Sequence, residues 1–211
     1  SFLLAVHEPP PHRRRVRCIA ADSPREYGPG TKYRHLRLSI PYAITFATFA
    51  YKNGGLHITG HNELYFRNEP LKTKNDTLCY PALLNISRIK SKKRERAWIC
   101  TQYLKRGAAD WTAQLQSLLE HTWNGGFNRS SEHHEGASWY GLSSDVHKEL
   151  PPVEKWEKAS QKNEGFALSV PWKPATLNVG QLIDCMFEEL SPHTSKLASS
   201  GNLVSRFQNW C

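Results

Sequence analysis

The segment that most constrains the fold is a run of alternating residues between positions 35 and 66. It opens with polar and apolar residues in alternation, and residues 43–51 are rich in aromatic and β-branched side chains. Asn53-Gly54-Gly55 then predicts a hairpin turn, because glycine adopts positive φ without steric cost. Two more short apolar runs follow the turn. The segment therefore predicts an antiparallel β-meander.

Helices are expected in the second half of the chain. Asp110 is a favourable N-cap for an amphipathic helix that ends at Gly125, and Thr176 can cap a last helix. Residues 128–165 are polar and are expected to form loops in which Trp139, Tyr140 and Trp156 are packed anchors, whereas residues 166–170 are expected to form a short strand. Strands followed by helices predict the α+β class, here an antiparallel β-meander packed with helices.

The 211 residues suffice for one domain with extensions. Residues 1–34 are rich in Pro, Gly and Arg and are expected to form an irregular basic arm. Residues 35–190 are expected to form the folded domain, and residues 191–211 a weakly ordered tail. No apolar run approaches the roughly 18 residues that span a bilayer, so no membrane association is expected.

Charge and cysteine content narrow the possible partners and compartment. The formal net charge of +9 favours nucleic acid, anionic lipid or an acidic protein as a partner, and basic residues cluster at 13–17 and 88–96. The five cysteines are odd in number and form no C-x-x-C pair. This pattern argues against a disulfide framework and a Cys-rich zinc site, and it predicts a reducing cytoplasm.

Cys100 is the candidate nucleophile. It ends a short apolar run, and a predicted helix follows. A thiol at the end of a strand or loop, within reach of a large partner, suits a cysteine that carries an acyl group as a thioester. An amide such as that of Asn85 can support the loop or the developing oxyanion. The competing interpretation of Cys100 is a buried core thiol, and Cys79 is interpreted as part of the core.

Several small motifs occur in a characteristic order over roughly residues 35–190. They are Ser39-Ile40-Pro41-Tyr42, Asp76-Thr77-Leu78-Cys79-Tyr80, Pro81-Ala82-Leu83-Leu84-Asn85-Ile86, Trp98-Ile99-Cys100, Gly126-Phe127-Asn128, Pro174-Ala175-Thr176-Leu177 and Gly180-Gln181-Leu182-Ile183. This order resembles the ubiquitin-conjugating fold, and within it the prokaryotic ubiquitin-conjugating-like proteins of the D type.

The resemblance implies an enzyme that transfers a ubiquitin-like protein. An activating enzyme would load the C-terminus of that protein onto Cys100 as a thioester, with Asn85 as the second catalytic residue, and a target amine would then attack. No cofactor or metal is implied. Members of the family occur in bacterial operons with a ubiquitin-like protein and its activating enzyme, and some of these operons defend against phages.

The chain departs from the family in the segment before the candidate nucleophile. Asn85 and Cys100 are fifteen positions apart, farther than the tight turn of the family allows, so the basic stretch between them would be an insertion. Its charge density predicts docking to an acidic surface of the activating enzyme or the substrate. The residues predicted to bind this partner are Arg88, Lys90, Lys92, Lys93, Arg94 and Arg96.

Three alternatives remain open on the sequence alone. A metal hydrolase would use histidines such as His57, His61 or the cluster at 132–135, but two residues four apart on a strand lie too far from each other for one ion. A nucleic-acid-binding protein would use the basic clusters and the aromatic residues between them. An inactive member of the conjugating fold would bind the ubiquitin-like protein as a scaffold.

Overall fold

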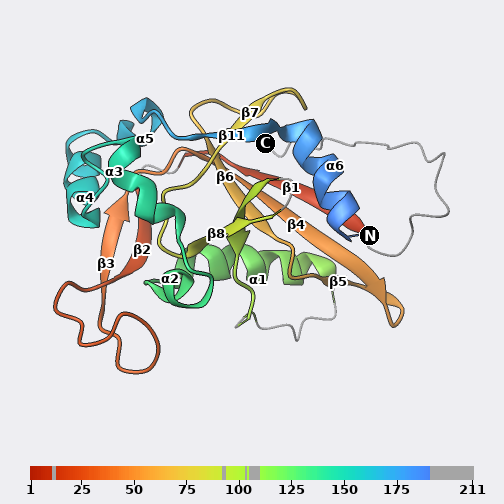
Figure 1. Cartoon of the computed structure of the whole chain (residues 1–211), viewed down its shortest axis with the longest axis horizontal. Coiled ribbons are helices and arrows are strands. Elements are labelled where there is room, and N and C mark those ends of the chain that lie inside the picture. The colour runs from red at the N-terminus through yellow and green to blue at the C-terminus, as the bar shows by residue number, and fades with distance from the viewer. Residues whose placement is uncertain (11–12, 92–93, 103, 105–109, 191–211) are drawn as a thin grey trace.

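Two β-sheets and a set of helices make up the part of the chain that the computed structural model describes, namely residues 1–10, 13–91, 94–102, 104 and 110–190. The strands of the larger sheet are β1 (Phe2–Glu8), β4 (Tyr42–Lys52), β5 (Gly55–Ile58), β6 (Glu63–Arg67), β7 (Thr77–Cys79), β8 (Ile86–Lys90), β9 (Glu95–Ile99) and β11 (Pro174–Asn178). They follow the order β1-β4-β6-β7-β11, with β5 beside β4 and β9 joining β8 to β6 (Figure 1). Their pairings are antiparallel, so the α+β prediction with antiparallel strands is confirmed.

The turn between β4 and β5 is the predicted hairpin. Asn53 and Gly54 have φ values of 49° and 82°, the left-handed conformation that such a two-residue turn requires. The chain then returns along β4 in two pieces, because β5 pairs with the end of β4 and β6 pairs with its start. The break lies where the Thr48 N–H donates to Oδ1 of Asn62 (2.9 Å) instead of to a strand carbonyl. The arrangement therefore differs from a simple meander.

The smaller sheet consists of β2 (Arg14–Ile19), β3 (Tyr33–Leu38) and β10 (Gly126–Phe127), in the order β10-β2-β3. β2 and β3 are antiparallel, whereas β10 runs parallel to β2. One face of the sheet is apolar and buried, with Val16, Cys18, Leu36 and Leu38 in the core. Burial raises the pKa of the Cys18 thiol to about 12, so this cysteine is an unreactive core residue.

The prediction that residues 1–34 form an irregular arm is wrong, because β1 and β2 form in this segment. β1 pairs along its whole length with β4, from Phe2 opposite Phe49 to Glu8 opposite Ala43. Its partner strand lies more than thirty residues farther along the chain, and a composition rich in Pro and Arg conceals such a pairing. The tail predicted for residues 191–211 lies outside the described residues.

The helices are α1 (Trp111–Asn124), α2 (Ser130–His134), the 3-10 helix η1 (Trp139–Leu142), α3 (Ser143–Val146), α4 (Val153–Lys162), α5 (Phe166–Ser169) and α6 (Val179–Leu190). The predicted boundaries of α1 are confirmed, since Asp110 accepts a hydrogen bond from the Thr112 N–H and Gly125 follows the helix. The loops expected at 128–165 instead contain short helices, and the strand expected at 166–170 is α5. None of the described helices has the length and apolar character needed to cross a membrane.

The start of α6 differs from the prediction, whereas the predicted packing of Trp139 and Trp156 is confirmed. Thr176 lies in β11, and Asn178 accepts a hydrogen bond from the Gln181 N–H (2.9 Å) at the start of α6. Trp156 of α4 is buried against the smaller sheet, and its Nε1 donates to the Ser39 carbonyl (3.1 Å). Trp139 of η1 donates to the Arg96 carbonyl (3.0 Å). η1 therefore packs on β8 and β9, and α4 packs on the smaller sheet.

Candidate functional site

The basic segment between Asn85 and Cys100 is mostly strand. β8 and β9 form an antiparallel hairpin whose register runs from Ile86 opposite Ile99 to Lys90 opposite Glu95. Because Asn85 comes directly before β8 and Cys100 directly after β9, both candidate residues lie at the open end of the hairpin, next to the pair Ile86 and Ile99. The fifteen-residue spacing predicted to be an insertion does not separate Asn85 from Cys100 in space, because the hairpin between them extends away from both residues.

Two consecutive residues of α1 bind this end of the hairpin. His121 Nε2 lies 2.8 Å from the Cys100 carbonyl oxygen, and Nδ2 of Asn85 donates to the Thr122 carbonyl oxygen at 2.7 Å. Because a carbonyl oxygen only accepts, Nε2 of His121 carries the proton. Sequence reasoning missed both α1 residues, since a His and a Thr near the end of an amphipathic helix carry no specific signal.

The Cys100 side chain is partly buried and is expected to be a neutral thiol at neutral pH. Burial raises its pKa, a hydrogen bond from the Gln102 backbone N–H lowers it, and the charge of Glu135 raises it again, with a net upward shift. Within the described residues, no imidazole is hydrogen-bonded to the Cys100 sulfur. The arrangement lacks the Cys–His pair that lowers the thiol pKa in cysteine proteases.

Glu135 reaches the site from the segment that follows α2. The Ser87 hydroxyl of β8 donates to its Oε2 (3.3 Å), and the Arg88 N–H donates to the carbonyl of Ala137 (2.9 Å). Burial raises the pKa of the Glu135 carboxyl, and the Ser87 hydrogen bond opposes that shift. The site therefore brings together a thiol, an amide and a carboxyl group from three separate segments.

The amide of Asn85 has unused hydrogen-bonding capacity. Its Oδ1 is buried and has no hydrogen-bond partner among the described residues. Its Nδ2 carries two hydrogens, of which the bond to Thr122 uses one. The side chain therefore fastens the loop to α1, as one of its two predicted roles requires, and retains an N–H for a further acceptor.

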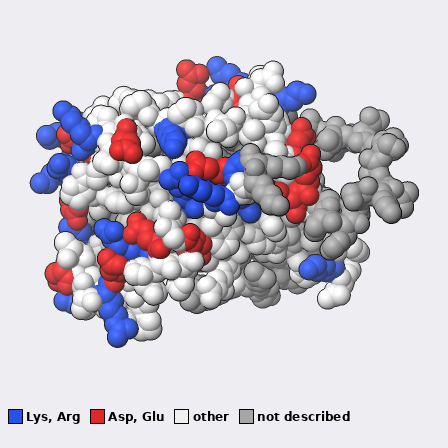
Figure 2. Space-filling model, in the orientation of Figure 1, with Lys and Arg blue, Asp and Glu red and all other residues white. Residues whose placement is uncertain are grey.

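The basic residues of the hairpin that the structure describes do not form one exposed docking surface. Figure 2 shows basic side chains over the hairpin with acidic side chains directly beside them. Arg88 donates to Glu95 (2.9 Å), while Lys90 is exposed. The prediction that Arg94 binds a partner at the surface is wrong, because its side chain is only 1% exposed. Lys92 and Lys93 lie outside the described residues.

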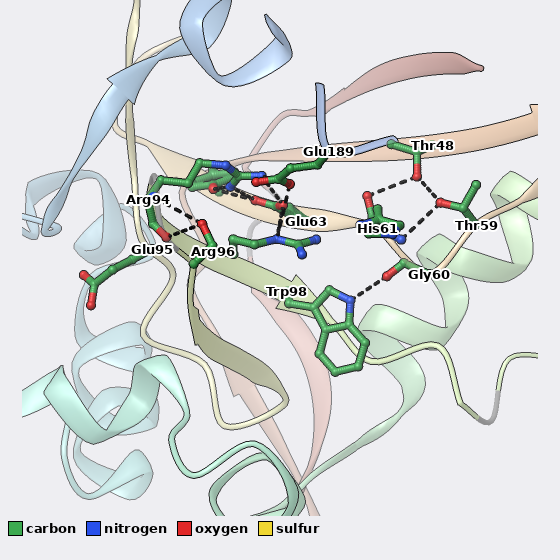
Figure 3. A network of polar contacts seen from close by, with 12 residues as sticks. Thr48, Thr59, Gly60, His61, Glu63, Arg94, Glu95, Arg96, Trp98 and Glu189 are labelled. Carbon is green, nitrogen blue, oxygen red and sulfur yellow. Dashed lines mark hydrogen bonds and ion pairs between the residues drawn. The ribbon is translucent and has the colours of Figure 1, made fainter. Parts of the chain in front are cut away.

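The Arg94 side chain belongs to a buried charged network that joins β6, β9 and α6 (Figure 3). Glu63 is fully buried and accepts hydrogen bonds from Arg94 (2.6 and 2.7 Å) and from Arg96 (2.8 Å). Glu189 of α6 accepts another from Arg94 (2.9 Å). Burial alone would raise the pKa of Glu63, but the hydrogen bonds and charges of Arg94 and Arg96 lower it below its usual value. Arg96, which was also predicted to bind a partner, is paired with Glu63 inside the protein.

The other candidate residues do not assemble into a second site. Cys79 lies in β7, where burial raises its pKa. Nε2 of His133 lies 2.7 Å from a carboxylate oxygen of Glu26, and its ring is tilted by 40° to that of Tyr27 at a centroid distance of 4.6 Å. Across the described ranges, no group of three or more His, Cys, Asp or Glu side chains is placed to hold a metal ion.

Comparison with known proteins found no matching family model, no matching curated protein and no matching solved structure. The function is therefore argued from the geometry around Cys100 and from the motifs of the sequence.

Proposed function

We propose that this protein is a ubiquitin-conjugating-like enzyme that accepts a ubiquitin-like protein as a thioester on Cys100 and transfers it to a target amine. The observation that carries the proposal is the convergence of Cys100 and Asn85 at the open end of the β8–β9 hairpin, where α1 is hydrogen-bonded to both. The order of motifs that resembles the conjugating fold supports it further.

The proposed chemistry is an exchange of acyl groups. The Cys100 sulfur attacks the carbonyl carbon of the donor thioester, and the donor thiol leaves with the proton that Cys100 gives up. The target amine then attacks the same carbon, an amide bond forms, and Cys100 leaves with the proton of the amine. A thiol of raised pKa is a slow leaving group, so its thioester persists longer than that of an acidic thiol.

The neighbouring side chains have separate tasks in this proposal. The remaining N–H of Asn85 donates to the negatively charged oxygen that forms on the attacked carbonyl. Before the attack, the Glu135 carboxylate accepts the extra proton of the target ammonium group, so that a neutral amine attacks; the second proton leaves with Cys100. His121 is a positioning residue, since it bonds the Cys100 backbone and not its sulfur.

One observation favours a non-catalytic alternative. The thiol of Cys100 is neutral and partly buried, as in a core cysteine. A scaffold with the same fold would bind the ubiquitin-like protein without forming a thioester. The two functions differ in whether Cys100 takes up an acyl group.

The test uses a short peptide with a C-terminal glycine thioester as the acyl donor, and intact-mass spectrometry under non-reducing conditions. Wild-type protein should gain one peptide at neutral pH, on Cys100, and release it to added lysine. Cys100→Ser should gain no thiol-sensitive adduct, whereas the matched control Cys79→Ser should behave as wild type. Acylation spread evenly over the cysteines, or none on Cys100, would favour the scaffold.

A further inference from the structure

The outward face of the smaller sheet carries a compact group of basic residues. Arg15 and Arg17 of β2 and His35 and Arg37 of β3 are exposed, while the residues that alternate with them are turned into the protein. The register places Arg15 opposite Arg37 and Arg17 opposite His35. These four residues, here called the arginine face, lie at the end of the molecule away from the β4–β5 turn (Figure 1).

The arginine face is electrostatically unfavourable in the isolated protein. Side chains directly opposite on antiparallel strands have Cβ atoms about 4.5–5.5 Å apart, and like charges at that distance destabilise the pair. The Arg17 guanidinium lies 4.0 Å from the centre of the Tyr33 ring, which leaves its charge unneutralised. In the described part of the chain, no carboxylate forms an ion pair with Arg15, Arg17 or Arg37.

The other arginines of the same strands show the contrast. On the inward face, Arg14 pairs with Glu8 (3.0 Å) and Arg34 pairs with Glu154. Glu157 accepts a hydrogen bond from the backbone N–H of Arg37 (3.0 Å) and forms no ion pair with its guanidinium group. The fold thus supplies carboxylates to the inward arginines, and the outward guanidinium groups remain available to a ligand.

Acidic residues of the loop that joins β2 to β3 do not neutralise the face either. Asp22 pairs with Lys32 (3.3 Å), and Glu26 contacts His133 (2.7 Å) and Arg129 (3.6 Å). Asp22 and Glu26 are therefore paired with other side chains and do not neutralise the arginine face.

We propose that the arginine face binds the phosphate backbone of a nucleic acid. Successive outward residues on a strand are about 7 Å apart and opposite ones about 5 Å apart, so the face presents three closely spaced guanidinium groups to a regularly charged chain. Guanidinium groups bind phosphate oxygens through two parallel hydrogen bonds, which a lysine does not. A two-stranded antiparallel ribbon also fits the major groove of duplex DNA. This binding does not depend on the thioester chemistry of Cys100.

The test is fluorescence polarisation of the full chain with a short labelled DNA duplex of random sequence, repeated over a series of salt concentrations. Single-stranded RNA of the same sequence is measured in parallel. Arg15→Gln/Arg37→Gln should weaken binding on the order of tenfold for each arginine removed. It should also reduce the slope of log affinity against log salt by about 0.9 for each lost phosphate contact. Arg15→Lys/Arg37→Lys should keep most of the salt slope and lose part of the affinity.

The matched control is Lys52→Gln/Lys72→Gln, which removes two exposed positive charges elsewhere on the surface and should bind as wild type. Thermal unfolding checks that each variant is folded. Equal binding by wild type and the Arg15→Gln/Arg37→Gln variant would overturn the proposal. Binding of poly-glutamate in place of both nucleic acids would also overturn it, and would assign the face to an acidic protein.

Discussion

At the scale of single residues, the surroundings of Cys100 suit a thiol that holds an acyl group. His121 and Thr122 of α1 bond the backbone of Cys100 and the side chain of Asn85, so both residues are held in place without direct contact of an imidazole with the sulfur. Burial, and to a smaller extent the charge of Glu135, raise the pKa of the thiol and favour its protonated form. The reactivity of Cys100 is therefore expected to depend on pH and to respond to a change at Glu135.

Replacing Glu135 by Gln tests this dependence. The Glu135 charge disfavours the thiolate and raises the pKa of Cys100, so its removal lowers that pKa and increases the thiolate fraction at neutral pH. Iodoacetamide should therefore alkylate Cys100 faster in Glu135→Gln than in wild type at neutral pH, and equally fast at a pH above both pKa values. Peptide mapping of the alkylated cysteine measures the rate. Glu120→Gln, a matched change at an exposed position of α1, should have no effect; an unchanged rate in Glu135→Gln would contradict the prediction.

At the scale of elements, the sequence predicted the turns and helix ends that depend on only a few neighbouring residues. The β4–β5 turn and the boundaries of α1 follow from a few residues each, and both predictions are confirmed. β1 and β9 depend on partners elsewhere in the chain, so their sequences carry no comparable signal. Cys100 and Asn85 were predictable as candidates, whereas Glu135 was not, because only the packing of the segment after α2 on β8 brings it to the site.

The buried network of Glu63 and Arg94 is expected to be critical for the joint between β6, β9 and α6. Glu63→Gln removes the charge that compensates Arg94, and loss of one partner of a buried pair costs about 3–5 kcal/mol of unfolding free energy. Urea denaturation measures this loss. The double variant Glu63→Leu/Arg94→Met, which leaves no buried charge of the pair, should recover part of it. A cost below about 1 kcal/mol for Glu63→Gln would mean that water reaches the network.

The same network predicts a direction for acid unfolding. The pKa of Glu63 is lower in the folded protein than in the unfolded chain, so its contribution is present above the unfolded pKa and is lost as the pH falls through the folded value. Wild type should therefore lose stability over this acidic range. Glu63→Gln should show a smaller loss over the same range, since it has no carboxyl to protonate.

At the scale of the whole molecule, the candidate thiol site and the arginine face are separate. The first is built on β8, β9 and α1, and the second on β2 and β3 of the other sheet. Among the described residues, the arginines of the hairpin beside the thiol site are paired with carboxylates, whereas Arg15, Arg17 and Arg37 of the arginine face are not. The two proposed activities should be separable by mutation.

We expect Arg15→Gln/Arg37→Gln to take up the peptide on Cys100 as wild type does, and Cys100→Ser to bind the DNA duplex as wild type does. The two assays described above, applied to both variants and to wild type, measure this separation. If either variant lost both activities while keeping its unfolding temperature, the two sites would be coupled through the protein.

The hairpin geometry of the candidate site has a consequence for the divergence of such chains. Asn85 and Cys100 lie at its open end, and at the other end the Ser91 N–H donates to the Arg94 carbonyl (2.9 Å). Residues added or removed at that other end change the length of the hairpin but not the pairing of Ile86 with Ile99. The number of residues between such an amide and such a thiol can therefore differ from one related chain to another. A sequence pattern that fixes this number would not detect the related chains in which it differs.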